Sequence, residues 1–154
     1  MNPKRPKLPL SQEEKQILRK MKIKFSDFHK LMIEEIVDLF DVSNERAKTL
    51  KGLATFQKVP SIGSELAFKL VTLLGYFTLE QIKTENWEEV FHNLELNLGC
   101  WTDSCVEDQI LCIIHYANYP DSEKQWFDFT NERKLYRQQN GYPISRPKTA
   151  WYEK

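Results

Sequence analysis

The sequence is poor in glycine and cysteine, contains no long uncharged apolar run and carries no net charge of either sign. Its 5 glycines and 7 prolines among 154 residues exclude a collagen-like or low-complexity chain. Three cysteines, an odd number, do not form a disulfide framework, which favours a reducing compartment. The longest apolar stretches, such as residues 110–119, are about half the length of a membrane span, and residues 1–6 lack the apolar part of a signal peptide. We therefore expect a cytoplasmic protein without a membrane segment.

The zero net charge is the sum of segments with opposite charge. Residues 1–24 carry eight basic and two acidic side chains, and residues 131–154 carry six and two. Residues 76–130 carry two basic and eleven acidic side chains, whereas residues 42–75 carry five and two. Such asymmetry indicates an electrostatic partner, so overall neutrality does not exclude a nucleic acid.

Apolar residues recur at helical spacing through most of the chain, which predicts an all-α fold. Ser11 and Glu14 have the spacing of a capping box and start a helix. Apolar positions over residues 28–40 predict a second, amphipathic helix, and Ser43 is expected to cap a third.

The composition divides the chain into three segments. Prolines among lysines predict a flexible basic arm over residues 1–10, followed by one compact helical domain over residues 11–130. Residues 131–154 are expected to form an irregular aromatic and basic segment that packs on this domain, held by Trp151 and Tyr152. A short helix over residues 131–139 would pair its basic face with the acidic middle of the chain, and exposed arginines there are candidate phosphate contacts.

Two helices are predicted to meet in a tight turn between Pro60 and Ser64. Pro60 ends the first helix, Ile62 fills the core, and Gly63 permits the backbone geometry from which the second helix starts. Small Ala67 would let the two helix axes approach closely.

The segment 59–75 resembles the helix-hairpin-helix motif. That motif has an apolar residue, proline, a small residue, isoleucine and glycine, then three variable residues, alanine and spaced aliphatic residues up to a final leucine and glycine. In that family the backbone amides of the hairpin and the helix N-terminus hold a DNA phosphate without reading base sequence. The resemblance implies phosphate capture by the amides of Ile62, Gly63 and Ser64. The candidate DNA-binding residues are Lys58, Ser61, Ile62, Gly63, Ser64 and Lys69.

Two positions depart from many DNA-binding versions of the motif. Ser61 stands where they have glycine, and Glu65 stands where they commonly have a basic residue. The carboxylate of Glu65 stabilises the helix N-terminus but repels a phosphate there. A hairpin that serves as a scaffold or as a protein-docking surface is therefore an alternative to DNA binding. An earlier stretch, residues 36–53, resembles a second, degenerate hairpin, as in tandem modules that grip both strands of a duplex.

Further motifs extend the resemblance to almost the whole chain. They are Cys105-Val106-Glu107-Asp108-Gln109, His115-Tyr116-Ala117, residues 126–134, Gly141-Tyr142-Pro143, Arg146-Pro147 and Ala150-Trp151-Tyr152. In this order they are similar to the bacterial pathogenicity-locus family of helix-hairpin-helix proteins, some of which are labelled mitomycin-resistance proteins. The resemblance covers roughly residues 11–152 and implies a fold and a role with DNA, without any reaction or catalytic residue.

Four potential zinc ligands fall within sixteen residues: Cys100, Cys105, Cys112 and His115. Neither C-x-x-C nor H-x-x-x-H spacing occurs, and on one helix Cys105 and Cys112 would lie about 10 Å apart along the axis. We therefore expect structural cysteines, no metal and no cofactor.

The adjacent carboxylates of Glu107 and Asp108 raise the hypothesis of a magnesium-dependent nuclease. Neighbouring positions on a helix point in different directions, and Asp103 before Ser104 is typical of a helix N-terminus. Asp103 and Glu107, four residues apart on one helix face, would instead pair with arginine or lysine of the tail. We therefore expect no enzyme activity.

The sequence predicts a non-catalytic, sequence-independent DNA-binding protein, with a DNA-damage role suggested by the family label. The alternative is a protein-interaction module on the same scaffold, with the acidic residues 80–95 as its docking surface. DNA is thus the expected partner, and a protein is the alternative one.

Overall fold

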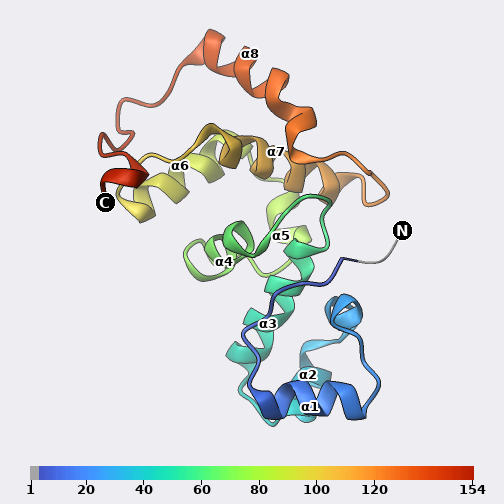
Figure 1. The fold of residues 1–154 in the computed structure, drawn as a ribbon. Coiled ribbons are helices and arrows are strands. Elements are labelled where there is room, and N and C mark those ends of the chain that lie inside the picture. The colour runs from blue at the N-terminus through green and yellow to red at the C-terminus, as the bar shows by residue number, and fades with distance from the viewer. Residues whose placement is uncertain (1–3) are drawn as a thin grey trace. The chain divides into compact units, whose positions relative to one another are not determined.

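The computed structural model describes residues 4–154 and consists of helices joined by turns (Figure 1). Within these residues an isolated bridge between Trp101 and Ala150 is the only extended pairing, so the predicted all-α class is confirmed. No helix in this part of the chain combines the length and apolar composition of a membrane span. Contacts divide the chain into two units, a boundary that differs from the predicted segments. The first unit contains the described residues up to Lys58 and Gly63–Thr78, and the second contains Val59–Ile62 and Leu79–Lys154.

The first unit begins with helices whose starts follow from side-chain caps. Its elements are α1 (Gln12–Lys20), the 3₁₀ helix η1 (Phe25–Lys30), α2 (Ile33–Phe40), α3 (Asn44–Gln57) and α4 (Ser64–Thr72). The amide of Glu14 donates to the Ser11 hydroxyl at 3.1 Å, and the amide of Ser11 donates to the Glu14 carboxylate at 2.9 Å. The Ser43 hydroxyl accepts from the Arg46 amide at 3.1 Å. Both predicted caps are therefore confirmed.

The single helix predicted over residues 28–40 is wrong, because η1 and α2 are separate. The Lys51 ammonium, which comes from α3, donates to the carbonyl of His29 at 2.8 Å and to that of Leu31. The amide of Met32 donates to the side-chain carboxylate of Glu35 at 2.9 Å. This hydrogen bond lies at the start of α2, which is therefore a separate helix. A distant lysine thus satisfies the carbonyls that a continuous helix would have used.

The core of the first unit joins α1, η1, α2 and α3. Its buried residues are Leu18, Phe28, Ile36, Phe40, Ala47, Leu50 and Ala54. Helix α4 packs on α3, and Ala67 is fully buried, as predicted. The close approach also depends on Gly52 of α3, where an added Cβ would lie 3.1 Å from the side chain of Val71.

Part of the predicted flexible arm contacts this unit, whereas residues 1–3 of it lie outside the described chain. The Gln57 side chain accepts from the amide of Lys7 and donates to its carbonyl, both at 2.9 Å. The guanidinium of Arg5 lies 4.2 Å from the ring centroid of Phe25. The arm thus contacts α3 through Lys7 and η1 through Arg5, and its flexibility stays a prediction.

The second unit is organised on one long helix. Its elements are α5 (Leu79–Lys83), α6 (Trp87–Leu98), α7 (Ser104–Asn118), the 3₁₀ helix η2 (Trp126–Phe129), α8 (Thr130–Asn140) and the 3₁₀ turn η3 (Trp151–Glu153). Helices α5, α6, η2 and α8 all pack on α7, and α8 confirms the short helix predicted over residues 131–139.

The end of the chain is held by backbone hydrogen bonds and by one of the two predicted aromatic side chains, Tyr152, whose ring centroid lies 5.9 Å from that of Trp101. The amide of Trp101 donates to the carbonyl of Thr149 at 2.9 Å, and the amide of Trp151 donates back to Trp101 at 3.0 Å. The side chains of Trp151 and Tyr152 are more than half exposed.

Candidate nucleic-acid interface

The N-terminus of α4 is an open group of backbone donors. Gly63 is its N-cap residue, whose carbonyl accepts from the Ala67 amide at 3.3 Å, and no side chain caps the helix. Within residues 4–154 the amides of Gly63, Ser64 and Glu65 donate no hydrogen bond. Unpaired donors at the positive end of a helix dipole form a suitable site for an anion.

Gly63 is not required there by the local backbone, contrary to the prediction. Its φ of −99° is accessible to any residue, and an added Cβ would meet no atom within 4 Å. The left-handed residue of the turn is Ser61, with φ of 66°. The missing side chain at Gly63 therefore leaves the approach to the α4 amides open.

Ser61 and Ile62 belong to the second unit, and their polar groups are already used there. The Ser61 hydroxyl accepts from the Trp126 amide at 2.9 Å and donates to the Pro60 carbonyl, which offsets a strained backbone conformation. Ile62 is fully buried, as expected, but its amide donates to the carbonyl of Val59 at 3.2 Å. Because this hydrogen bond closes the turn, the prediction that Ile62 offers an amide to phosphate is corrected.

The two predicted lysines lie in the first unit. Lys58 is the C-cap of α3, and its positive charge acts together with burial, the larger cause, to lower the pKa of His29 and of Lys51. Lys69 lies on α4, about 7.5 Å along the axis from Ser64. It follows the exposed Glu65 by four residues, yet no carboxylate of the described chain lies within 4.0 Å of its ammonium.

A basic residue that the sequence analysis did not select also reaches this helix terminus. A hollow of about 320 Å³ is lined by Lys7, Leu8, Pro9, Leu53, Ser64 and Phe68. The bound arm thus brings Lys7 to the hollow that Ser64 lines. The basic excess of residues 1–24 was the only signal in the sequence, because nothing there shows where the arm binds.

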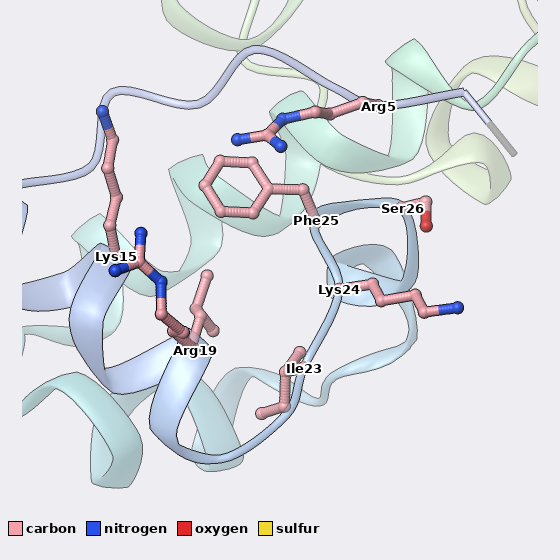
Figure 2. A pocket seen from close by; sticks show the side chains of 8 residues that line it. Arg5, Lys15, Arg19, Ile23, Lys24, Phe25 and Ser26 are labelled. Carbon is pink, nitrogen blue, oxygen red and sulfur yellow. The ribbon is translucent and has the colours of Figure 1, made fainter.

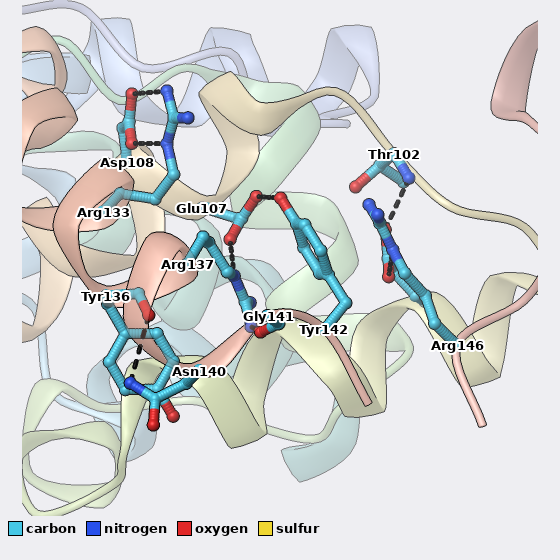
Figure 3. A network of polar contacts seen from close by, with 11 residues as sticks. Thr102, Glu107, Asp108, Arg133, Tyr136, Arg137, Asn140, Gly141, Tyr142 and Arg146 are labelled. Atoms are coloured by element: carbon cyan, nitrogen blue, oxygen red, sulfur yellow. Dashed lines mark hydrogen bonds and ion pairs between the residues drawn. The ribbon is translucent and has the colours of Figure 1, made fainter. Parts of the chain in front are cut away.

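The basic tail, by contrast, is held in a buried network of ion pairs (Figure 3). Arg137 of α8 donates to Glu107 of α7 at 2.7 Å, and the Tyr142 hydroxyl donates to the other carboxylate oxygen at 2.6 Å. Glu107 is 0% exposed. The Tyr142 ring lies between two guanidinium groups, 4.0 Å from Arg137 and 3.8 Å from Arg146.

Two further arginines of the tail have the same arrangement. Arg133 donates to Asp108 at 2.9 Å, and Arg146 donates to Glu95 at 2.8 Å and 3.0 Å. Asp108 and Glu95 are each 1% exposed. The predicted pairing of the tail with the acidic middle is confirmed, whereas the idea that these arginines are exposed phosphate contacts is wrong.

Protonation in the network follows from the same contacts. Burial, followed by the hydrogen bond to Glu107, raises the pKa of Tyr142 to about 12. The hydrogen bond to Asp108 raises the pKa of Arg133 further. Glu107 and Asp108 are therefore buried and bound to arginine, so they are not accessible to hold magnesium at a phosphate.

None of the three cysteines forms a disulfide. Cys100 and Cys112 are buried and Cys105 is half-buried, where burial and then Asp103 raise the pKa of its thiol. Asp103 accepts from the Cys105 amide at 2.9 Å and caps α7. Among residues 4–154 no three histidine, cysteine or acidic side chains gather as a metal would require.

Comparison with known proteins adds one finding. The model of the Cdd1 family, described as pathogenicity locus, matches residues 49–135, a range that includes most of α3, the turn and α4 as well as Arg133. No curated protein and no solved structure matches the chain.

Proposed function

The chain belongs to the pathogenicity-locus family, and from this premise we propose that it is a non-catalytic, sequence-independent DNA-binding protein. In this proposal α3, the turn and α4 act as a helix-hairpin-helix, and the amides of Gly63 and Ser64 hold a phosphate of the DNA backbone. Lys7, Lys58 and Lys69 add positive charge around it.

The observation that carries the proposal is the open N-terminus of α4. Ser11, Ser43 and Asp103 cap α1, α3 and α7 with their side chains, whereas α6 and α8 begin without a side-chain cap, as α4 does. At α4 the N-cap residue is Gly63, which lacks a side chain although neither its φ nor its surroundings demand glycine. Uncapped amides with unobstructed access suit a phosphate oxygen.

The turn before α3 supports a tandem arrangement. Asp41 has φ of 53° and lies two residues before the N-cap Ser43, just as Ser61 lies two residues before Gly63. The α2–α3 turn thus repeats the local backbone pattern of the α3–α4 turn. Its N-cap carries a side chain, however, so the Gly63 terminus is the better phosphate site.

Gly63→Glu tests the proposal directly. We expect it to weaken binding to a fluorescent DNA duplex about 10- to 100-fold, because hydrogen bonds to a charged group are worth roughly 1.5–3 kcal/mol. Gly63→Gln, similar in size but uncharged, is the matched control and should weaken binding much less. A Lys58→Ala/Lys69→Ala variant should reduce the salt dependence of binding. Wild-type protein that binds no duplex, single-stranded or branched DNA at low salt would refute the proposal.

A protein-interaction role remains the second candidate, and one observation favours it. Glu80, Glu85 and Glu89 are exposed and have no ion pair with any described residue. Glu95, the last residue of the expected docking surface, is buried against Arg146 and takes no part. Stoichiometric co-purification of a protein that survives nuclease treatment, and is lost on Glu85→Lys/Glu89→Lys, would support this role.

A further inference from the structure

A second concentration of positive charge lies in the first unit, away from the predicted DNA-binding residues. It surrounds a hollow of about 330 Å³, here called the basic hollow (Figure 2). The lining residues are Arg5, Lys15, Leu18, Arg19, Ile23, Lys24, Phe25 and Ser26. No acidic side chain is among them. In Figure 2 the charged ends of Arg5, Lys15 and Arg19 extend to the same side of the Phe25 ring, whereas Lys24 points the other way.

The three cations of the basic hollow are uncompensated. No carboxylate of the described chain lies within 4.0 Å of Arg5, Lys15 or Arg19. Lys15 and Arg19 are four residues apart on α1, a spacing at which like charges repel. The negative end of the helix dipole stabilises Arg19 in the last turn, but it does not account for Lys15 or Arg5. The site is therefore one that an anion would stabilise.

The geometry of Arg5 suits a phosphate. Its guanidinium carbon lies over the Phe25 ring, 4.2 Å from the centroid, and no carboxylate of the described chain forms an ion pair with it, so its N–H donors can still bind an anion. The stacking and the two hydrogen bonds between Gln57 and Lys7 fix the arm. A positioned guanidinium loses less conformational entropy when it binds an anion than a freely rotating one does.

The arm connects this hollow to the N-terminus of α4 within the same unit. Arg5 lines the basic hollow, and Lys7, two residues later, lines the hollow that contains Ser64. One bound segment of chain therefore contributes a basic residue to each of the two hollows.

We propose that the basic hollow binds a phosphate group of the same DNA strand whose neighbouring phosphate lies at the N-terminus of α4. That the bound phosphate belongs to this DNA strand rests on the proposed function. The affinity of the basic hollow for phosphate rests only on Arg5, Lys15 and Arg19. The hollow would add affinity and salt dependence without base specificity.

The first experiment uses Arg5→Gln/Lys15→Gln/Arg19→Gln in the full chain. The control is Lys20→Gln/Lys134→Gln/Lys148→Gln, which removes the same net charge at exposed positions outside the hollow. Binding to a labelled DNA duplex is measured by fluorescence anisotropy between about 50 and 200 mM salt. We expect the hollow variant to bind at least tenfold more weakly, with a log–log salt slope reduced by about 0.9 per lost phosphate contact. The control should differ from wild type by less than threefold.

The second experiment uses inorganic tripolyphosphate, measured by calorimetry, and does not depend on DNA. Wild type and Gly63→Glu should both show a tripolyphosphate site at the hollow, and the hollow variant should lose that site and keep at most the weaker binding of the α4 terminus; circular dichroism checks that the variant is folded. A hollow variant that binds both tripolyphosphate and DNA like wild type would overturn the inference. If only Gly63→Glu lost DNA binding, the inference would fail and the proposed function would stand. If tripolyphosphate bound at the hollow but no DNA bound to wild type, the proposed function and the strand assignment would both fail.

Discussion

The two basic ends of this chain look alike in composition, yet they have different structural roles. Residues 1–24 and residues 131–154 both have a basic excess. In the tail, Arg133, Arg137 and Arg146 each bind a buried carboxylate. In the N-terminal region, Arg5 and Arg19 have no such partner among the described residues. Similar local charge therefore serves internal stability in one unit and remains available for an external anion in the other.

Protonation also differs between the two units. The hydrogen bond with Asp108 raises the pKa of Arg133, so that cation is stabilised by its partner. Burial and the nearby Lys58 lower the pKa of Lys51, whose ammonium donates to two backbone carbonyls and so serves the fold of the first unit.

The largest effect is expected from Glu107→Ala, which removes the acceptor of a buried pair. The free energy of unfolding should fall by roughly 3–5 kcal/mol, because the Arg137 guanidinium stays largely buried without its carboxylate partner and the Tyr142 hydroxyl loses its acceptor. Chemical denaturation followed by circular dichroism measures this loss. Glu132→Ala, at an exposed position of α8, is the control and should change stability by less than about 0.5 kcal/mol. Equal losses in both variants would contradict a structural role for the tail network.

Two positions of the turn before α4 can be compared: Ser61, whose hydroxyl is hydrogen-bonded, and Gly63, which has open space around it. Ser61→Ala and Ser61→Gly both leave the Trp126 amide without its acceptor, but only alanine must adopt the left-handed backbone. We expect Ser61→Ala to be about 1 kcal/mol less stable than Ser61→Gly in thermal or chemical unfolding. Gly63→Ala, at φ of −99° and in open space, should change stability by less than about 0.5 kcal/mol. Equal stability of the Ser61→Ala and Ser61→Gly variants would show that the backbone of the turn changes its conformation to accommodate alanine.

A smaller gain in DNA affinity is expected from Glu65→Gln. The carboxylate lies in the first turn of α4, where it competes with a bound phosphate for the positive end of the helix. Removing its charge should strengthen DNA binding about two- to fivefold, as measured by fluorescence anisotropy at low salt. Glu80→Gln, which removes an exposed acidic charge in the second unit, should leave affinity unchanged. Weaker binding by Glu65→Gln would argue against the α4 terminus as the phosphate site.

The smallest effect is the pH dependence that His29 introduces. Burial, then Lys58 and Lys30, lower the pKa of His29, so the folded protein binds fewer protons than the unfolded chain near pH 6. Its contribution to stability is therefore complete above the ordinary pKa of 6.5 and is lost as pH falls through the folded pKa. Thermal unfolding at about pH 7.5 and 5.5 should show a smaller decrease for His29→Gln than for wild type. Identical decreases would mean that the charge around Lys58 is compensated in solution.

Local sequence signals predicted local structure well. Ser11 with Glu14, Ser43 and Asp103 start helices where their spacing indicates, because a cap involves residues only two or three apart. The helix predicted over residues 28–40 failed because the competing partner, Lys51, comes from another helix. The turn between α3 and α4 was predicted at the residues where it occurs, but Gly63 and Ser61 exchanged the conformational roles that their residue types suggested.

The sequence by itself determined the all-α class, the family, most helix starts and the segmental distribution of charge, because periodicity, caps and motifs depend on residues close together in the chain. Tertiary structure alone decided which charges are available. It paired the tail arginines with Glu95, Glu107 and Asp108, bound the arm through Gln57, and left Arg5 and Arg19 beside a hollow without an acidic lining residue. The physical reason is that an ion pair depends on distance in space, and a side chain fifty residues away in sequence can neutralise a charge that its neighbours cannot.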